Sequence, residues 1–389
     1  MISLDGQRNE MPTAVFFASE TQQVLFGSEA MQAYLEGADG RLLRSLKSLL
    51  GSPLMDEYTQ VNGQAMRFFD IVVLFLRELK RRCELQLGCP IHRAVVGRPV
   101  HFVDDNTTRD QLAQATLLRA AREAGFEHID FQQEPIAAAL DFEQRLDKET
   151  TALIVDIGGG TSDFSVIRLN RQRSHVRDRH ADILATTGVH IGGTDFDRLL
   201  DLSTVMPLLG YKHIGTGGRP VPNSIFFDLS TWHLIHQTTT RKAMHFAREL
   251  WTDYADQSLH RRLVQVLEDG HGHRILSSVE RAKIDCSISR TPATVSLDFF
   301  DAALSPSLTP AVLQQALHNA LSQVVQCALQ CIQLSALPSV DVVYLTGGSS
   351  ALQPLMDALR AALPSAQLVE GNRFGGVAAG LAYCAATTS

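Results

Sequence analysis

The sequence of 389 residues is 45% hydrophobic and 20% charged, and its length exceeds one ordinary hydrophobic core, so we expect two lobes. A net charge of -7 and a pI near 6.0 exclude nucleic acid and anionic membrane surfaces as the main partners. The chain opens without a basic segment followed by an apolar one, and no apolar run is long enough to span a bilayer, which predicts a cytoplasmic protein.

Residues 1–148 are predicted to form the first lobe, lobe I. The segment 94–100 (AVVGRPV) is typical of a strand, and the apolar spacing after it predicts a helix that ends near Ala124. A second helix is expected over 134–146 (EPIAAALDFEQRL), with Pro135 at its start. The polar residues 148–151 are predicted to link this lobe to the next.

The segment 154–163, IVDIGGGTSD, is the part of the sequence that says most about which ligand the protein binds. Its apolar run predicts a buried strand, and the glycines turn the chain into a second strand, DFSVIRL. Because glycine has no Cβ, the backbone of Gly158, Gly159 and Gly160 can point several N–H groups at a phosphate. The flanking Asp156 and Asp163 then require a hard cation such as Mg²⁺. The alternative is a glycine turn beside two solvated acids.

Residues 149–370 are predicted to form lobe II, with an inserted helical subdomain at about 200–310. Before the insertion we expect a solvated Arg-rich hairpin at 171–179, then a strand, a Gly192-Gly193 turn and a helix. Asp195 and Asp197 fall in the first turn of that helix, where its dipole favours acids. Amphipathic helices are expected over 277–289 and 311–334. A strand at 340–345, a glycine turn at 346–349, a helix, a strand at 367–369 and a final helix within 371–389, returning to lobe I, complete the chain.

Strands, glycine turns and helices thus recur in both halves, which predicts an α/β protein with mixed sheets covered by helices. The sequence has no Walker A pattern and no G-x-G-x-x-G, so neither a P-loop nor a Rossmann site is supported.

Taken in order, these motifs resemble the actin-like ATPase superfamily, whose fold is ribonuclease H-like, and within it the nucleotide-binding domain of the heat-shock protein 70 (DnaK-type) family, in particular its short YegD-like members. DIGGGTSD is similar to the second phosphate loop of the family, GGTDFD to the segment after it and QEPIAAALDF to the helix crossing between lobes. SVERAKIDCS and VVYLTGGSS resemble the ribose helix and the adenosine loop, while MPTAVFF, LFGSEA and LKSLLG resemble the early strand, turn and lysine segment. The resemblance implies a two-lobed fold that binds ATP or ADP with Mg²⁺ in a central cleft.

The resemblance also implies roles for particular residues. The catalytic candidates are Lys47, Glu134, Asp156 and Asp163, of which Lys47 would reach the γ-phosphate and attacking water, while Asp156 and Glu134 would hold Mg²⁺ through its water shell. The nucleotide-binding candidates are Gly158, Gly159, Gly160, Thr161, Gly192, Gly193, Glu280, Lys283, Ser287, Gly347, Gly348 and Ser349. The spacing of Glu280, Lys283 and Ser287 lets all three face one ligand, although an ordinary solvated Glu and Lys pair is the alternative.

The sequence departs from the family pattern at three places. The D-x-G-T hairpin that opens the family and forms its first phosphate loop is missing here, as expected for a start placed too late, a truncated chain or a degenerate ATPase. Ile284 and Ala351 stand where the family has arginines around adenine, which predicts relaxed base selectivity. The sequence stops soon after the last expected helix, which predicts a protein without the peptide-binding domain of the family.

Three functions remain open from the sequence. The first is an ATP-binding, chaperone-like protein without a peptide-binding domain, which works through an unknown protein partner or client. In this function ATP hydrolysis drives the protein only if the first phosphate loop exists in the native protein. The second is a metabolite kinase of the same superfamily that acts on a sugar or similar alcohol. The third is a non-catalytic nucleotide sensor or assembly module.

Overall fold

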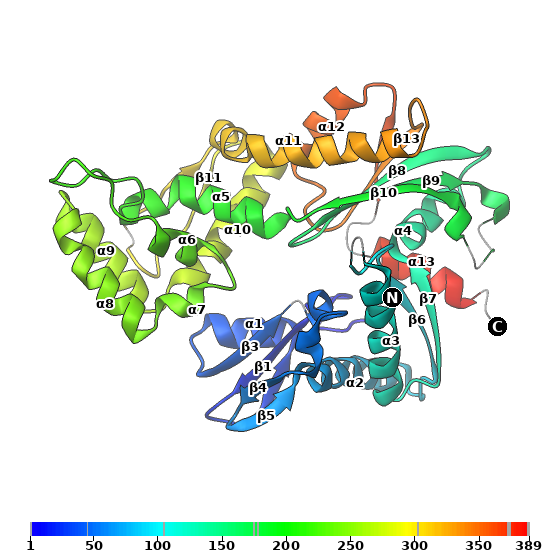
Figure 1. Cartoon of the computed structure of the whole chain (residues 1–389), viewed down its shortest axis with the longest axis horizontal. Coiled ribbons are helices and arrows are strands. Elements are labelled where there is room, and N and C mark those ends of the chain that lie inside the picture. The colour runs from blue at the N-terminus through cyan, green and yellow to red at the C-terminus, as the bar shows by residue number, and fades with distance from the viewer. Residues whose placement is uncertain are drawn as a thin grey trace. The chain divides into compact units, whose positions relative to one another are not determined.

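The computed structural model describes residues 2–44, 46–103, 106–173, 176, 179–301, 303–371 and 375–386, without the side chains of Ser48 and Asp141. The chain forms two compact units (Figure 1). Unit 1 comprises residues 1–151, 167–183 and 371–389, and unit 2 comprises residues 152–166 and 184–370. None of the described helices combines the length and the apolar character that crossing a bilayer requires.

The first part of unit 1 is an antiparallel sheet with the strand order β2-β1-β3. Its strands are β1 (Ala14–Ala18), β2 (Val24–Phe26) and β3 (Gly40–Arg44), and the helix α1 (Gly27–Leu35) follows β2. Every residue of β1 is buried, as its run of alanine, valine and phenylalanine demands. A hairpin of β4 (Tyr58–Val61) and β5 (Gln64–Arg67) follows, and Asn62 and Gly63 at its tip both have positive φ, the conformation that two-residue hairpin turns favour.

The rest of unit 1 pairs two parallel strands with helices. Its elements are α2 (Phe68–Leu87), β6 (Arg93–Arg98), α3 (Thr107–Glu123), β7 (His128–Gln133), α4 (Glu134–Glu143) and α13 (Gly376–Ala386). β6 and β7 pair in parallel, and α13, red in Figure 1, lies against α4. A Cβ on Gly380 would lie 1.9 Å from the carbonyl oxygen of Ala137, so the two helices touch through their backbones.

A five-stranded sheet with the order β10-β9-β8-β13-β14 forms the base of unit 2. Its strands are β8 (Thr150–Ile157), β9 (Ser162–Leu169), β10 (Ile183–Val189), β13 (Val342–Thr346) and β14 (Gln367–Glu370). β13 runs parallel to both β8 and β14. The predicted polar link at 148–151 is wrong for its last two residues, because the β-branched Thr150 and Thr151 already belong to β8.

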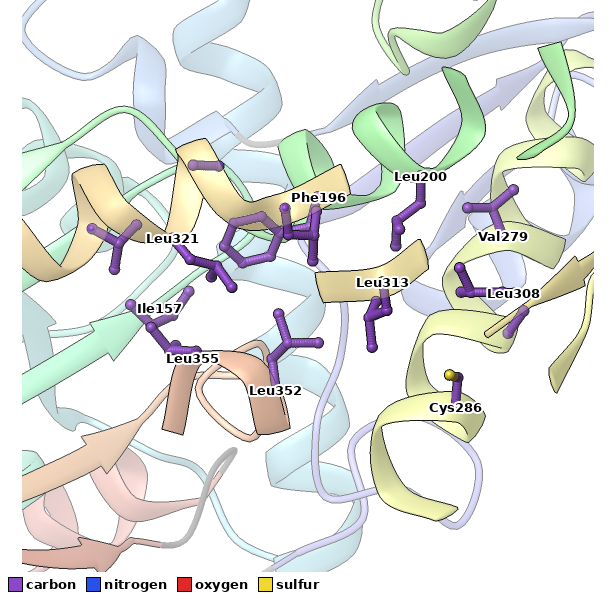
Figure 2. Close-up of a cluster of buried hydrophobic side chains, with 14 of the residues drawn as sticks. Ile157, Phe196, Leu200, Val279, Cys286, Leu308, Leu313, Leu321, Leu352 and Leu355 are labelled. Carbon is purple, nitrogen blue, oxygen red and sulfur yellow. The ribbon is translucent and has the colours of Figure 1, made fainter. Parts of the chain in front are cut away.

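Helices build most of the core of unit 2. They are α5 (Gly193–Thr204), α6 (Ser224–Ser230), α7 (Ile235–Thr238), α8 (Arg241–Glu249), α9 (Gln257–Glu268), α10 (Gly272–Ser289), α11 (Pro310–Leu334) and α12 (Gln353–Ala362), with a small ladder of β11 (Ala293–Thr294) and β12 (Ser307–Leu308). Figure 2 shows how Ile157 from β8, Phe196 from α5, Leu321 from α11 and Leu355 from α12 meet in one buried cluster. The expected mixed α/β class is therefore confirmed.

Candidate functional site

Two glycine turns meet where the parallel strands β8 and β13 end. Thr346, the last residue of β13, lies opposite Asp156 of β8, so the backbone leaves both strands at the same edge of the sheet. Gly347 has a φ of +84°, and a Cβ there would lie 2.4 Å from Asp156 Oδ1 and 2.5 Å from the carbonyl oxygen of Ile157. The N–H of Ser349 donates to the same Ile157 oxygen at 3.1 Å. Only glycine fits at 347, because both the conformation and the space exclude a side chain.

A third glycine turn, at the start of α5, packs against the first two. The backbone N–H and the hydroxyl of Thr194 both donate to the carbonyl oxygen of Gly159 at 2.8 Å. A Cβ on Gly192 would lie 2.6 Å from that oxygen, and one on Gly193 would lie 2.3 Å from Ser349 Oγ. Unit 2 therefore brings together the three glycine segments that the sequence places far apart.

The tip of the hairpin between β8 and β9 is open. The N–H of Gly158 closes the hairpin by donating to the carbonyl oxygen of Thr161 at 2.9 Å. A Cβ on Gly159 or Gly160 would meet no heavy atom within 4 Å, and neither glycine has a positive φ. Within the described residues, no hydrogen-bond acceptor takes the N–H of Gly159, Gly160 or Thr161. Neither strain nor crowding requires glycine here, and the exposed run of N–H groups suits an anion.

The acids beside this tip offer oxygen donors. Asp156 is half-buried at the end of β8, while the exposed Asp163 on β9 accepts a hydrogen bond from Thr161 Oγ1 at 3.0 Å. Across the described residues, no group of three or more His, Cys, Asp and Glu side chains could hold a metal ion unaided. These residues fit Mg²⁺, which keeps several waters and takes ligands from phosphates, better than a cation that needs a full protein cage.

Lys47 and Glu134 lie together in unit 1. Lys47 Nζ is 2.5 Å from Glu134 Oε1, and the side chains are 49% and 22% exposed. Lys47 stands on a 3₁₀ turn between the buried Leu46 and Leu50, which leaves the lysine directed outward. Glu134 begins α4, where the helix dipole favours an acid, and Gly97 on β6 leaves room for it, since a Cβ there would lie 3.1 Å from Glu134 Cγ.

The three predicted nucleoside residues of α10 have different environments. Glu280 is exposed, as expected for a residue that meets a ligand. Lys283 is buried and its Nζ is 2.8 Å from Asp197 Oδ1 on α5. Ser287 is also buried, and its Oγ accepts from the N–H of Gln353 at 2.9 Å. Helical spacing does put the three on one side of α10, but packing covers two of them and gives them protein partners.

The dipole explanation for Asp197 is wrong. Asp195 does fill that position, because its carboxylate accepts from the N–H of Gly192 at 3.0 Å at the start of α5. Asp197 is instead buried, and burial raises its pKa to about 6 while the charge of Lys283 opposes that rise. The sequence does carry a signal for this, since Asp197 falls in the same helical stripe as Phe196 and Leu200, which face the core.

The predicted solvated hairpin at 171–179 is also wrong for its last residue. Arg179 is only 2% exposed, and its guanidinium lies 2.5 Å from Glu143 Oε2 and 2.8 Å from Asp182 Oδ2. Glu143, which ends α4, also accepts from the N–H of Asn170 at 2.7 Å. We name Glu143, Arg179 and Asp182 the buried charge cluster of unit 1. Glu143 continues the spacing of buried residues along α4, which is the signal that the sequence offered.

The sheet of unit 2 has adjacent parallel strands that end in glycine turns, with acids and an open N–H run beside them, and this arrangement is consistent with the mixed α/β fold expected of an actin-like ATPase. The model of the Hsp70 protein family matches residues 41–205, a segment that holds Lys47, Glu134 and the hairpin between β8 and β9. This segment of the chain is therefore similar to the Hsp70 protein family, as its motifs suggest.

Curated relatives agree with this match. The chaperone protein DnaK of Thermosipho melanesiensis is 32% identical over 193 residues, which is 49% of this chain and 29% of the relative. DnaK of Thermotoga neapolitana is 30% identical over 193 residues, with the same coverage, and DnaK of Mycoplasmopsis pulmonis is 30% identical over 200 residues, 51% of this chain and 30% of the relative. The chain thus matches less than a third of the length of these relatives.

Proposed function

We propose that this chain is an ATP-binding, chaperone-like protein of the Hsp70 type, related to the YegD-like members, that acts on or through another protein. The observation that carries the proposal is the exposed hairpin tip of Gly159, Gly160 and Thr161, whose N–H groups have no acceptor among the described residues. Three successive donors beside two carboxylates match the needs of a polyphosphate and its cation.

In this proposal unit 2 binds the nucleotide. The β- and γ-phosphates take the N–H groups of the hairpin tip, while Glu280 and the turn of Gly347, Gly348 and Ser349 lie against the nucleoside. Mg²⁺ supplies charge neutralisation of the phosphates when it is bound, and Asp156 holds its water shell. Ile284, 46% exposed beside Glu280 on α10, offers the base an apolar surface without hydrogen bonds, which supports relaxed base selectivity.

Unit 1 contributes Lys47 and Glu134 in this proposal. Glu134 would accept hydrogen bonds from water on the cation, and its pairing with Lys47 already fixes its orientation. Lys47 would place a positive charge where negative charge develops during phosphoryl transfer. Hydrolysis would let the protein alternate between ATP and ADP forms, and a partner or client protein would respond to that change.

Asp156→Asn provides the test of the proposed cation role. We expect the variant to bind Mg²⁺-ADP roughly tenfold to a hundredfold more weakly, because an amide is a poorer acceptor for water held by Mg²⁺. Adenosine, which carries no phosphate and needs no cation, should bind equally to both proteins. Calorimetric titration of each ligand, with Mg²⁺ and with a chelator, measures these effects. Equal weakening of both ligands would remove Asp156 from the cation site, and no binding of ADP to the unaltered protein would overturn the proposed function.

Gly160→Ala tests the hairpin tip itself. The new methyl group meets no protein atom but would occupy the space of the phosphate, so we expect ADP affinity to fall by about tenfold or more. The free energy of unfolding should stay within about 1 kcal/mol of the unaltered value. Gly217→Ala is the matched control, because a Cβ there also meets nothing within 4 Å but lies far along the chain from the glycine turns. Identical ADP affinities of the two variants would contradict phosphate binding at the tip.

Phosphate release separates this function from its alternative. If ATP is turned over only when a sugar or another small alcohol is added, the protein is a metabolite kinase and the chaperone-like function is excluded.

A further inference from the structure

A carboxyl group lies deep inside unit 2 without a partner. Asp201, on α5, is 0% exposed, and within the described residues no hydrogen bond of ordinary geometry reaches either of its side-chain oxygens. Ser230, at the end of α6, acts on the pKa of Asp201, and its hydroxyl is also buried without a hydrogen bond of ordinary geometry among the described residues. An ionised carboxylate without a counter-charge is among the least favourable groups to bury.

Asp197 lies one helical turn before Asp201 on α5 and adds a second buried carboxyl group to the same region. Asp197 and Asp201 are four residues apart and both are buried, and the ammonium of Lys283 lies 2.8 Å from Asp197 Oδ1. Among the described residues, no ion pair reaches Asp201. No ion pair joins Arg198 of the same helix to either acid in the described part of the chain. Asp197 thus has a counter-charge, and Asp201 has none within the residues that the structure describes.

Among the described residues, the other elements packed against α5 form no further ion pair with Asp197 or Asp201. From α10, Glu280 acts on Asp197 and adds negative charge. The short segment 206–209 (MPLL) has no ionisable side chain, and α11 carries His318 on its exposed side. α6 carries Asp228, half-buried and again negative. The surroundings therefore favour one proton on the acid pair rather than two negative charges.

Burial raises the pKa of Asp201 to about 7; Ser230 opposes this rise, and the charge of Asp197 adds to it. Because Asp197 has the lysine beside it, it ionises first, and the proton stays on Asp201. A protonated Asp201 can donate to Ser230 Oγ, which gives both buried groups a partner.

We propose that Asp201 is a positioning residue that holds a proton at neutral pH, so that Asp197 alone pairs with Lys283 and fixes the lysine, and with it α10, in the geometry that presents Glu280. This inference rests on the proposed nucleotide function for its consequence, but not for the proton. When Asp201 loses the proton, its negative charge repels that of Asp197, which disturbs the pair of Asp197 and Lys283, and the contact between α5 and α10 loosens. Nucleotide affinity then falls.

The first experiment detects the proton without any nucleotide. The folded pKa of Asp201 lies above its unfolded value near 3.8, so its contribution to stability is complete below that value and is lost as the pH rises through about 7. The urea midpoint of the unaltered protein should therefore fall, relative to that of Asp201→Asn, between pH 5 and pH 8. Asp285→Asn, which changes an exposed acid of α10, should follow the unaltered protein. Parallel curves for Asp201→Asn and Asp285→Asn would overturn the proposed proton.

The second experiment measures Mg²⁺-ADP affinity from pH 6 to pH 8.5. We expect the affinity of the unaltered protein and of Asp285→Asn to fall above pH 7, by up to about tenfold per pH unit. Asp201→Asn, and Asp201→Leu as a second uncharged variant, should bind with the same affinity across this range. A flat profile for the unaltered protein would overturn the positioning role even if the urea series supports the proton. Absence of ADP binding at every pH would overturn the proposed function, and the urea series would still decide the proton.

Discussion

Arg179→Met is expected to lower the stability of unit 1 by about 3–5 kcal/mol. The substitution keeps most of the side-chain volume but leaves Glu143, which is 0% exposed, and Asp182 without the guanidinium that balances them. Breaking a buried ion pair by removing one partner is costly because the remaining charge stays buried. Native-state hydrogen exchange of the amides in α4, which ends at Glu143, measures the loss for this unit alone.

Arg173→Met is the matched control for Arg179→Met. Arg173 also contacts Asp182, at 3.1 Å, but its side chain is 43% exposed, so we expect a change below about 1 kcal/mol. Pairing Arg179→Met with Glu143→Gln should recover part of the lost stability, because the double variant buries one fewer unpaired charge. Equal effects of the two arginine variants would show that burial does not govern the cluster.

Lys47→Ala is expected to slow ATP hydrolysis by about 10²–10³ if the chain turns ATP over as proposed. The lysine is the cation paired with Glu134, and removing it takes away a positive charge that would stabilise the transferring phosphoryl group. Single-turnover release of phosphate isolates the chemical step from product release. ADP affinity should change much less than the rate, since the contribution is made mainly in the transition state.

Lys242→Ala, which removes an exposed lysine from α8, serves as the control for Lys47→Ala and should hydrolyse ATP at the unaltered rate. Lys47→Arg keeps the charge and separates loss of charge from loss of geometry. An unchanged rate in Lys47→Ala would exclude Lys47 from catalysis. Binding of ATP without any phosphate release in the unaltered protein would instead favour the nucleotide sensor over the ATPase.

The sequence predicts the repeating elements of this protein well because their signals are local. Apolar spacing locates α3, α5 and α11 within a few residues, and the glycine turns mark where strands end. The three glycine segments of unit 2 could also be grouped by resemblance, and the structure packs them together at one edge of the sheet. Local patterns thus carry the class of fold, and together with the resemblance they locate the proposed phosphate site.

Buried charged residues are where prediction from the sequence failed most, and the reason is physical. Arg179 and Glu143 are 36 residues apart, and nothing near either residue reveals that the other neutralises it. The same holds for Lys283, whose partner Asp197 lies on another helix. A charged residue is predicted to be exposed to solvent unless its partner is known. Only the stripes of core residues on α4 and α5 indicated that these acids are buried.

The division of the chain into units has a topological consequence. The backbone changes units after residues 151, 166, 183 and 370, so unit 1 is assembled from three separate segments and unit 2 from two. No single proteolytic cut can release either unit as a continuous polypeptide. A fragment that ends at residue 151 would keep Glu143 yet lack the segment that carries Arg179, its buried counter-ion. A fragment of this protein therefore keeps all of its buried partners only if it contains every segment of the unit to which those partners belong.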